Sequence, residues 1–470
     1  MSFLSNRFIL FFLAVWGLSI VLRPHKRVYK SLIVIASFVF YGFFGIYGVL
    51  VLTVDVLINY GLIRLLERDK AKREILGLAV GFNVLFLAAY KYFNVFAEGM
   101  AGRGLGVGAE IIVPVGISFI TFKIISVLVD SYRQKIRVKS LADYIAFVSF
   151  FPQITAGPIG RYREFEQDLN RLNGFGVDIY KLETGRFWTL MIGGWLKMYL
   201  IGGALFEVVN QTINSPQSFG RVDLLLGMVS LSFFIYANFS GYSDMSEAVA
   251  GALGFRTPKN FDDPYRSGGV GEFWQRWHIS LSSWLRDYLY IPLGGNRKGM
   301  PRKYFNLLAT MTIGGVWHGV GVNFLVWGGI HGVMLVLDHA LGNLIRPKFV
   351  GITKGIKALF KGVGWLLTFG LINITWIIFY PKNIGFSIRY LENLVGSREP
   401  LVTLWSVKLG CVLVLSGILS VFGGKIQETV SGVLTKAPWV ARYFLLIAIF
   451  YLIILFGPST YVAPAAYFNF

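Results

Sequence analysis

The sequence predicts an all-α, polytopic membrane protein. Hydrophobic residues make up 55% of its 470 residues, the mean hydropathy is +0.59, and only 15% of the residues are charged. Such a composition is typical of chains whose apolar runs cross a bilayer. The 54 glycines allow helices to approach closely, and the 23 tyrosines and 12 tryptophans suit the membrane interface. We therefore expect one membrane domain over residues 1–470.

Basic residues are grouped in short loops between the apolar runs. The net charge is +20, from 45 Lys and Arg against 25 Asp and Glu. Such loops are typical of the cytoplasmic side of a membrane protein, and they favour contact with membrane lipid over nucleic acid. Three clusters, near residues 23–30, 64–73 and 133–139, are in phase and predict an outside N-terminus. The first apolar run has no evident cleavage site and is expected to remain as a helix.

The N-terminal part, residues 1–140, has room for paired spans between these basic loops. The candidate spans lie near residues 31–47, 48–63, 75–97 and 111–130. The next segment, 141–160, contains Pro152 and Pro158 with two glycines. This pattern predicts a broken or re-entrant segment, which is tolerated at membrane depth only where protein or water covers its backbone. Residues 161–183 are charged and are expected at the interface.

The central part, residues 141–345, continues with spans near 187–209 and 222–240 and a shorter helix near 241–254. The stretch 255–304 is too polar to span a membrane. Within that stretch, residues 272–290 have the periodicity of one amphipathic helix. Its aromatic face comprises Trp274, Trp277, Leu281, Trp284 and Tyr288, and its polar face Arg276, Ser280, Ser283 and Asp287. The pattern predicts a helix that lies in or dips into the membrane, with His278 on the flank of the aromatic face.

A hairpin of spans near 305–320 and 321–341 follows, and it places His318 toward the far end of the first arm. The C-terminal part, residues 346–470, has three more candidate spans, near 363–380, 403–421 and 440–457. The expected total is about 11 to 13 spans. No internal repeat is evident, which disfavours many transporter folds.

Two of the five histidines, His318 and His331, lie in the apolar run Gly314–Gly332. An ionisable residue inside a membrane span is costly and suggests a functional site. Trp317 can wall a pocket beside His318, and Gly319 leaves room for a ligand. A desolvated, neutral His318 would suit a general base. The alternative is a core histidine bonded to a carbonyl of a neighbouring helix, and His331 is a candidate to line the site.

Five further residues are weaker candidates. His278 is either functional or an interfacial histidine bonded to headgroups or water. Asp244 could orient a histidine or pair with an arginine for structure. Arg276, Arg286 and Asp287 are candidates for buried ion pairs or for phosphate contacts.

Several chemistries are not supported by the sequence. It contains no Walker-type phosphate loop, no HExxH and no G-x-S-x-G, and its histidines are too scattered to suggest a metal site. We expect no bound metal and no bound cofactor. The one cysteine, Cys411, permits no disulfide within the chain and is expected to be a small core residue.

Together, several motifs resemble the membrane-bound O-acyltransferase (MBOAT) family, within it the alginate O-acetyltransferase branch. They are PVGISFITFKIISVLVDSYR (114–133), FFPQITAGPIGRY (150–162), YSDMSEAVAGALGF (242–255), FWQRWHISLSSWLRDYLYIPLGGNR (273–297), GGVWHGVGVNFLVWGGIHG (314–332) and the terminal AYFNF. The resemblance implies a ring of helices around a thin centre, where a cytoplasmic funnel meets an outer one. It maps the family's essential histidine onto His318 and its second polar position onto His278.

The resemblance also implies an enzyme of the bacterial inner membrane that transfers acyl groups from a thioester, either acetyl-CoA or an acyl-carrier phosphopantetheine. The acetyl groups would serve O-acetylation of an alginate-like exopolysaccharide, with a periplasmic acetyltransferase as partner. D-alanyl transfer to teichoic acid and acetylation of peptidoglycan or cellulose are alternatives within the same fold. A proton-coupled transporter is the alternative outside the enzyme class.

Overall fold

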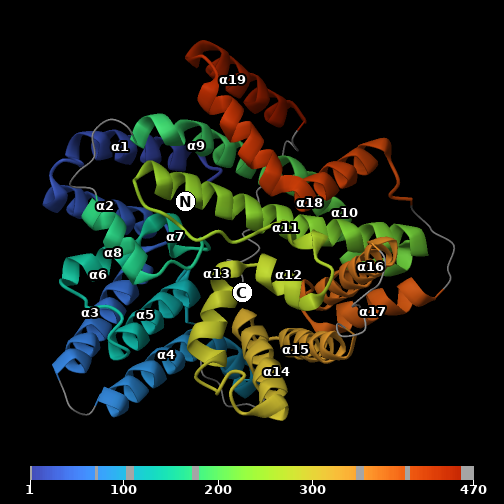
Figure 1. Ribbon diagram of the computed structural model, residues 1–470, viewed down its shortest axis with the longest axis horizontal. Coiled ribbons are helices and arrows are strands. Elements are labelled where there is room, and N and C mark those ends of the chain that lie inside the picture. Colours follow the sequence, from blue (N-terminus) through green and yellow to red (C-terminus); the bar gives the residue numbers. More distant parts are fainter. Residues whose placement is uncertain are drawn as a thin grey trace. The chain divides into compact units, whose positions relative to one another are not determined.

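The computed structural model describes residues 3–68, 72–101, 111–171, 179–345, 354–396 and 403–456. Within these ranges, all regular secondary structure is helical (Figure 1). The prediction of an all-α chain is therefore confirmed. The terminal AYFNF motif lies outside the described residues.

Seven helical segments in the described ranges are long and apolar enough to cross a membrane. They are Ile46–Arg68, Lys72–Glu98, Thr184–Asn214, Arg221–Ala252, Val322–Gly342, Ala358–Phe379 and Val407–Lys436. Two further apolar helices, Asn6–Leu22 and Trp439–Leu452, are shorter. These segments make the chain a multi-pass membrane protein. The expected total of about 11 to 13 spans also counts shorter helices, and it stays a prediction.

The chain forms two compact units. Unit 1 contains the described residues of Met1–Met191 and Tyr242–Pro258, and unit 2 those of Ile192–Gly241 and Lys259–Ala466. The expected single domain with three parts, and its ring of helices, stay predictions. His278, His318 and His331 all lie in unit 2, whereas Asp244 lies in unit 1.

Unit 1 is built mainly from the first nine helices. They are α1 (Asn6–Leu22), α2 (Lys26–Gly42), α3 (Ile46–Arg68), α4 (Lys72–Ala101), α5 (Ile117–Tyr132), α6 (Leu141–Ser149), α7 (Phe151–Ile154), α8 (Tyr162–Arg171) and most of α9 (Ile179–Trp195). Helices α1, α2 and α3 lie side by side in sequence order, and α5 packs against α3 and α4 (Figure 1).

The segment predicted to be broken is interrupted in the structure. Helix α6 ends at Ser149, and the one-turn helix α7 follows with Pro152 in its first turn. Gly116, just before α5, has a φ of +75°, and a Cβ added there would lie 2.1 Å from the carbonyl oxygen of Ile154. Only glycine therefore fits where the start of α5 meets the end of α7.

A single long helix, α11 (Arg221–Ala252), takes the place of the span and the separate short helix expected over 222–254. That expectation was wrong because Gly241 serves packing and does not end the helix. A Cβ on Gly241 would lie 2.7 Å from Cγ of Met198 and 2.8 Å from the carbonyl oxygen of Gly194. In unit 1, the Ser246 hydroxyl near the end of α11 donates to the Pro152 carbonyl at 2.6 Å.

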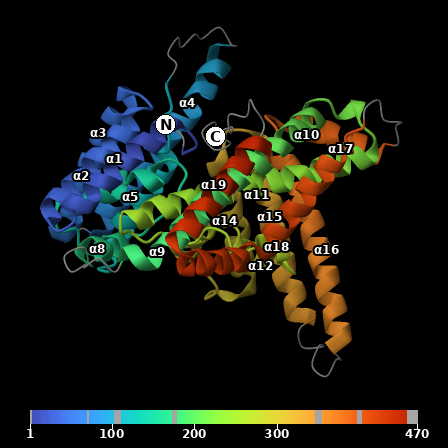
Figure 2. The same ribbon diagram turned by 90° about the horizontal axis from the view of Figure 1, so that it is seen from above.

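Unit 2 holds the remaining elements. They are the π-helix η1 (Leu196–Gly202), α10 (Gly203–Asn214), the 3₁₀ helix η2 (Pro216–Ser218), most of α11, the 3₁₀ helix η3 (Pro264–Arg266), α12 (Val270–Arg276), α13 (Ile279–Leu285), the π-helix η4 (Arg286–Tyr290), α14 (Gly299–His318), α15 (Val322–Ile345), α16 (Lys354–Phe379), α17 (Ile384–Val395), α18 (Val407–Lys436) and α19 (Trp439–Phe456). The predicted helical hairpin over 305–341 is confirmed as α14 and α15, and α15 also packs against α16 (Figure 2). Helix α15 contains one of the seven candidate spans, whereas the membrane crossing expected for α14 stays a prediction.

Residues 272–290 do not form the single amphipathic helix that was predicted. They form α12, α13 and η4, with a break at Trp277 and His278. The aromatic side chains Trp274, Trp277 and Trp284 are buried, and so is Ser280 on the face predicted to be polar. The rings of Trp274 and Trp277 thus pack in the hydrophobic core of unit 2, and the ring of Trp284 packs against that of Tyr288.

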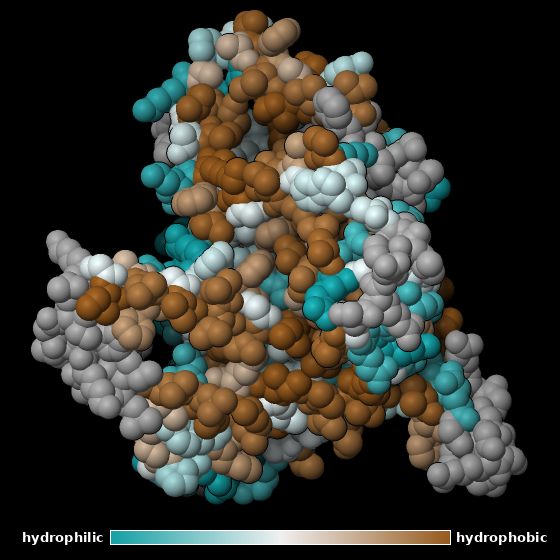
Figure 3. All heavy atoms as spheres, turned by 90° about the vertical axis from the view of Figure 1, so that its right-hand side faces the viewer, coloured by the Kyte–Doolittle hydropathy of each residue, from teal (hydrophilic) through white to brown (hydrophobic). Residues whose placement is uncertain are grey.

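Large hydrophobic side chains are exposed along the outer helices. On α16 they include Leu359, Leu366 and Leu367, and a broad hydrophobic area covers the face drawn in Figure 3. Exposed apolar surface of this kind suits contact with lipid tails. Cys411 on α18 is exposed as well, so its expected place in the core was wrong.

Candidate functional site

A seam of glycines lies between α14 and α15, the two helices that carry His318 and His331. A Cβ on Gly315 would lie 2.3 Å from the carbonyl oxygen of Phe324, and one on Gly328 would lie 2.5 Å from that of Met311. A Cβ on Gly332 would lie 2.9 Å from Cα of Leu308. Small residues allow such close approach between membrane helices, where packing rather than hydrophobicity drives association.

His318 is the last residue of α14, and aromatic rings surround its imidazole. It is 5% exposed, and its ring centroid lies 5.3 Å from that of Trp327 and 5.1 Å from that of Phe379, both nearly edge-on. The ring of Trp317 lies 4.6 Å away. This aromatic box excludes most water, so polar interactions with a bound reactant would be strong.

Gly319 follows His318 and lets the chain leave α14 beside Phe324. A Cβ on Gly319 would lie 2.3 Å from a ring carbon of Phe324. Phe324 in turn packs edge-on against Phe379, with 5.3 Å between ring centroids. In the structure, Gly319 therefore makes room for a protein side chain next to His318.

His331 is completely buried, and both of its ring nitrogens have protein partners. The indole Nε1–H of Trp274 donates to Nδ1 at 3.2 Å, and Nε2 lies 3.1 Å from the Thr375 hydroxyl. That hydroxyl already donates to the Ile372 carbonyl at 2.8 Å, so it accepts a hydrogen bond from Nε2–H. His331 is thus a neutral imidazole that links α12, α15 and α16.

His278 lies at the break between α12 and α13, with its backbone in the left-handed region (φ 43°, ψ 53°). It is 2% exposed, and Nδ1 has no hydrogen-bond partner among the described residues. Burial lowers the pKa of His278 to about 4, so the ring is neutral at pH 7. A strained backbone and an unsatisfied buried nitrogen together are typical of a functional position.

Within unit 2, packed tryptophan rings connect the surroundings of His318 with those of His278. Trp327, beside His318, stacks on Trp376 with 6.0 Å between ring centroids. Trp376 lies 5.0 Å from Trp277, the residue before His278. The aromatic core therefore runs without interruption from the imidazole of His318 to the residue before His278.

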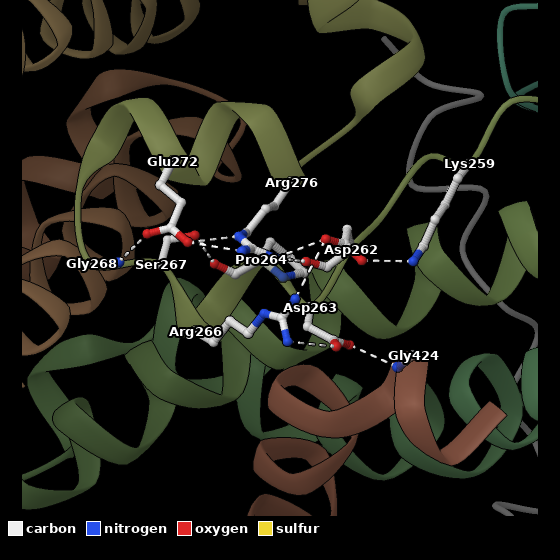
Figure 4. Close-up of polar contacts among 10 residues, drawn as sticks. All are labelled: Lys259, Asp262, Asp263, Pro264, Arg266, Ser267, Gly268, Glu272, Arg276 and Gly424. Carbon is white, nitrogen blue, oxygen red and sulfur yellow. Dashed lines mark hydrogen bonds and ion pairs between the residues drawn. The ribbon is translucent and has the colours of Figure 1, made fainter. Parts of the chain in front are cut away.

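The three charged candidates of this region form ion pairs. Nη1 of Arg276 contacts Oδ2 of Asp262 at 2.8 Å, and Nη2 contacts Oε1 of Glu272 at 2.9 Å (Figure 4). Arg286 and Asp287 pair with each other at 2.9 Å, with Arg286 63% exposed. Arg276 thus braces the loop before α12, and the exposed pair contributes little to stability.

The sequence did not single out Asn260, whose side chain contacts the start of α13. Its Oδ1 accepts hydrogen bonds from the backbone N–H of Ser280 at 3.2 Å and from the Ser280 hydroxyl at 2.6 Å. The contact spans twenty positions, so helical periodicity could not reveal it. Within the described ranges, no three His, Cys, Asp or Glu residues come together as metal ligands.

The family model of the membrane-bound O-acyltransferases matches residues 33–380. A probable alginate O-acetylase AlgI of Pseudomonas putida is 34% identical over 400 residues, which cover 83% of this chain and 79% of that protein. The protein of the same name from Pseudomonas aeruginosa is 34% identical over 93% of this chain and 84% of its own length. A peptidoglycan O-acetyltransferase of Helicobacter pylori is 31% identical over 78% of this chain and 74% of its own length.

Proposed function

Because the chain belongs to the membrane-bound O-acyltransferase family, we propose that it moves acetyl groups from a cytoplasmic thioester across the membrane for O-acetylation of an exopolysaccharide. The family makes the chain an acyltransferase, and its long apolar helices make it a multi-pass membrane protein. Membership of an enzyme family also argues against the transporter alternative. The bacterial inner membrane is the proposed location.

Two relatives named as alginate O-acetylases support an alginate-like polysaccharide as the final acceptor, because their similarity covers most of both chains. The relative named as a peptidoglycan O-acetyltransferase supports a second candidate, acetylation of peptidoglycan. A periplasmic acetyltransferase that receives the acetyl group and completes the transfer is the proposed partner in the first case.

His318 is the proposed general base. The donor is an acetyl thioester, either acetyl-CoA or an acyl-carrier phosphopantetheine. Nε2 or Nδ1 of His318 takes the proton of an acceptor hydroxyl, and the oxygen attacks the thioester carbonyl. The C–S bond then breaks, an ester forms, and the proton passes from His318 to the departing thiolate. The buried aromatic box around His318 is the observation that carries the proposal, since it favours transfer over hydrolysis.

His278 is the proposed second functional residue. Its neutral ring can donate a hydrogen bond to the oxygen that becomes negative during attack, or it can hold a reactant in place. Its buried Nδ1, which has no hydrogen-bond partner among the described residues, supports this role, because a buried polar atom that lacks a partner costs free energy unless a bound molecule satisfies it. His331 is not proposed as a base, because both of its nitrogens are engaged.

The test is the variant His318→Ala in membranes supplied with labelled acetyl-CoA. We expect normal accumulation and loss of label transfer to polymer. His25→Ala is the matched control, because His25 is exposed and makes no side-chain cap. Transfer by His318→Ala at the rate of the native protein would overturn the assignment. Transfer of labelled D-alanine instead of acetate would replace the proposed acyl group while keeping the base.

A further inference from the structure

The loop before α12 holds the backbone on both sides of His278. The N–H of Asp262 donates to the carbonyl of Arg276 at 3.0 Å, and the N–H of Ile279 donates to the carbonyl of Asn260 at 2.9 Å. Two residues of one short segment thus bracket the break between α12 and α13. Backbone hydrogen bonds from residues outside α12 and α13 therefore stabilise the left-handed conformation of His278.

Asn260 also supplies the cap that His278 does not. His278 occupies the N-cap position of α13 but makes no side-chain hydrogen bond to the helix. Oδ1 of Asn260 instead accepts from the N–H and the hydroxyl of Ser280. The N–H of Ser280 in the first turn of α13 is satisfied in this way, and the imidazole of His278 is not used for capping.

The neighbours of Asn260 strengthen the same attachment. The ring of Phe261 lies 5.0 Å from that of Trp277, nearly edge-on, and 6.4 Å from the imidazole of His278. The carboxylate of Asp262 pairs with Arg276, which also contacts Glu272 (Figure 4). Each residue from Asn260 to Asp262 therefore contacts the chain next to His278, and Asn260 alone supplies the cap.

We propose that Asn260 is a positioning residue for the transfer reaction. It holds His278 at the break so that Nδ1, which no described residue contacts by a hydrogen bond, is available to the reacting groups. Asn260 touches neither substrate nor the transferred group in this proposal and acts through His278 alone. The inference rests on the proposed function of His278.

The first test compares Asn260→Ala with Asn260→Asp. Alanine removes the acceptor for both donors of Ser280, and we expect kcat to fall about tenfold or more while the KM for the acetyl donor changes less than about twofold. Aspartate keeps an acceptor oxygen in place, and it should restore kcat to within about threefold of the native value. If the substitutions only impaired folding, both variants would yield less active protein, and aspartate would not restore kcat.

The second test is a double-mutant cycle with His278→Ala. If Asn260 acts through His278, Asn260→Ala causes no further loss in the His278→Ala background. The matched control is Asn373→Ala, since Asn373 is also buried in unit 2 and accepts a hydrogen bond from the Ser232 hydroxyl at 2.7 Å. Asn373→Ala should lower thermal stability but leave kcat per folded molecule unchanged.

Each outcome decides between the two proposals. Native kcat in Asn260→Ala, together with loss of activity in His278→Ala, would overturn the role of Asn260 alone. Native activity in His278→Ala would overturn the proposed function of His278, and the role of Asn260 with it. If Asn260→Ala fails to accumulate, Ser280→Ala takes its place, because it removes one of the two donors. A loss from Ser280→Ala that persists in the His278→Ala background would then count against the proposal.

Discussion

The indole of Trp274 and the imidazole of His331 form a hydrogen bond across 3.2 Å, from α12 to α15. The bond gives Nδ1 the role of acceptor and leaves Nε2 to donate to Thr375. His331 thereby links α12, α15 and α16. The environment of His318, on the other arm of the hairpin, is different because aromatic rings surround its imidazole. The two histidines of the hairpin should therefore respond differently to substitution.

His331→Phe should lower stability and spare turnover. Phenylalanine keeps a ring at this buried position but removes the acceptor of the Trp274 indole N–H, whereas the Thr375 hydroxyl still donates to the Ile372 carbonyl. We expect the free energy of unfolding to fall by about 1–3 kcal/mol for the group left unsatisfied. Thermal unfolding in detergent, measured beside acetyl transfer per folded molecule, checks this. A stable but inactive variant would show that His331 takes part in the reaction.

Gly315→Ala should be destabilising, because the new Cβ would lie 2.3 Å from the Phe324 carbonyl oxygen. We expect a loss of about 1–3 kcal/mol, as for other overpacked sites. Gly329→Ala on the same hairpin is the matched control, since no atom of the described residues lies within 4 Å of a Cβ there. That variant should be neutral or slightly more stable. Equal melting temperatures for the two variants would argue against the glycine seam.

His278→Gly should be more stable than His278→Ala, although both should lose activity. The backbone at this position has a φ of 43°, which glycine adopts freely and alanine does not. The expected difference in the free energy of unfolding is about 1 kcal/mol. Melting temperatures of the two purified variants provide the comparison. A more stable alanine variant would contradict the left-handed conformation.

The stability of the protein should depend on the protonation of His278 in mild acid. Its folded-state pKa of about 4 lies below the ordinary value of 6.5, so the unfolded chain binds more protons between these values. The contribution of the neutral His278 ring to stability is therefore fully present above pH 6.5. It is lost as the pH falls toward 4, by at most about 1.4 kcal/mol per pH unit.

The measurement is the difference in unfolding free energy between the native protein and His278→Gly, followed from pH 7 to pH 4. We expect this difference to shrink as the pH falls, because the variant lacks the titrating ring. The exposed His25→Ala variant should track the native protein throughout. A difference that stays constant over this range would mean that His278 is already charged, or already paired, in the folded state.

Arg276→Ala should cost more stability than Arg286→Ala. Arg276 contacts two carboxylates and is 21% exposed, whereas Arg286 pairs with its neighbour Asp287 and is 63% exposed. Exposed ion pairs typically contribute between 0 and about 1 kcal/mol, so Arg286→Ala should leave the melting temperature nearly unchanged. Chemical denaturation of both variants tests the ranking. The reverse order would show that the loop before α12 is not braced by Arg276.

Hydrophobic runs and glycine patterns predicted the long elements well, because these signals are local. The hairpin of α14 and α15, with His318 at the end of its first arm, follows directly from the apolar run and its glycines. The break in the segment after residue 141 follows from Pro152. The charge pattern also predicted that Arg276 could form an ion pair, and in the structure it pairs with Asp262.

The errors arose where distant contacts override local pattern. Residues 272–290 have helical periodicity, but hydrogen bonds from Asn260 and Asp262 stabilise a break at His278 that periodicity cannot reveal. Gly241 indicates a break in the sequence, yet close packing against Met198 keeps α11 continuous. The polar partners of His331 come from two other helices, so its structural role could not be inferred from its own neighbours in the chain.

The tryptophans between the two proposed functional histidines give this region an optical signature of its own. The ring centroid of Trp376 lies 5.0 Å from that of Trp277 and 6.0 Å from that of Trp327, close enough for the electronic transitions of neighbouring rings to couple. Near-ultraviolet circular dichroism depends on such fixed packing and disappears when side chains lose their arrangement. The order of the aromatic core can therefore be followed in unlabelled protein, separately from helix content, as a substrate binds or a variant loosens.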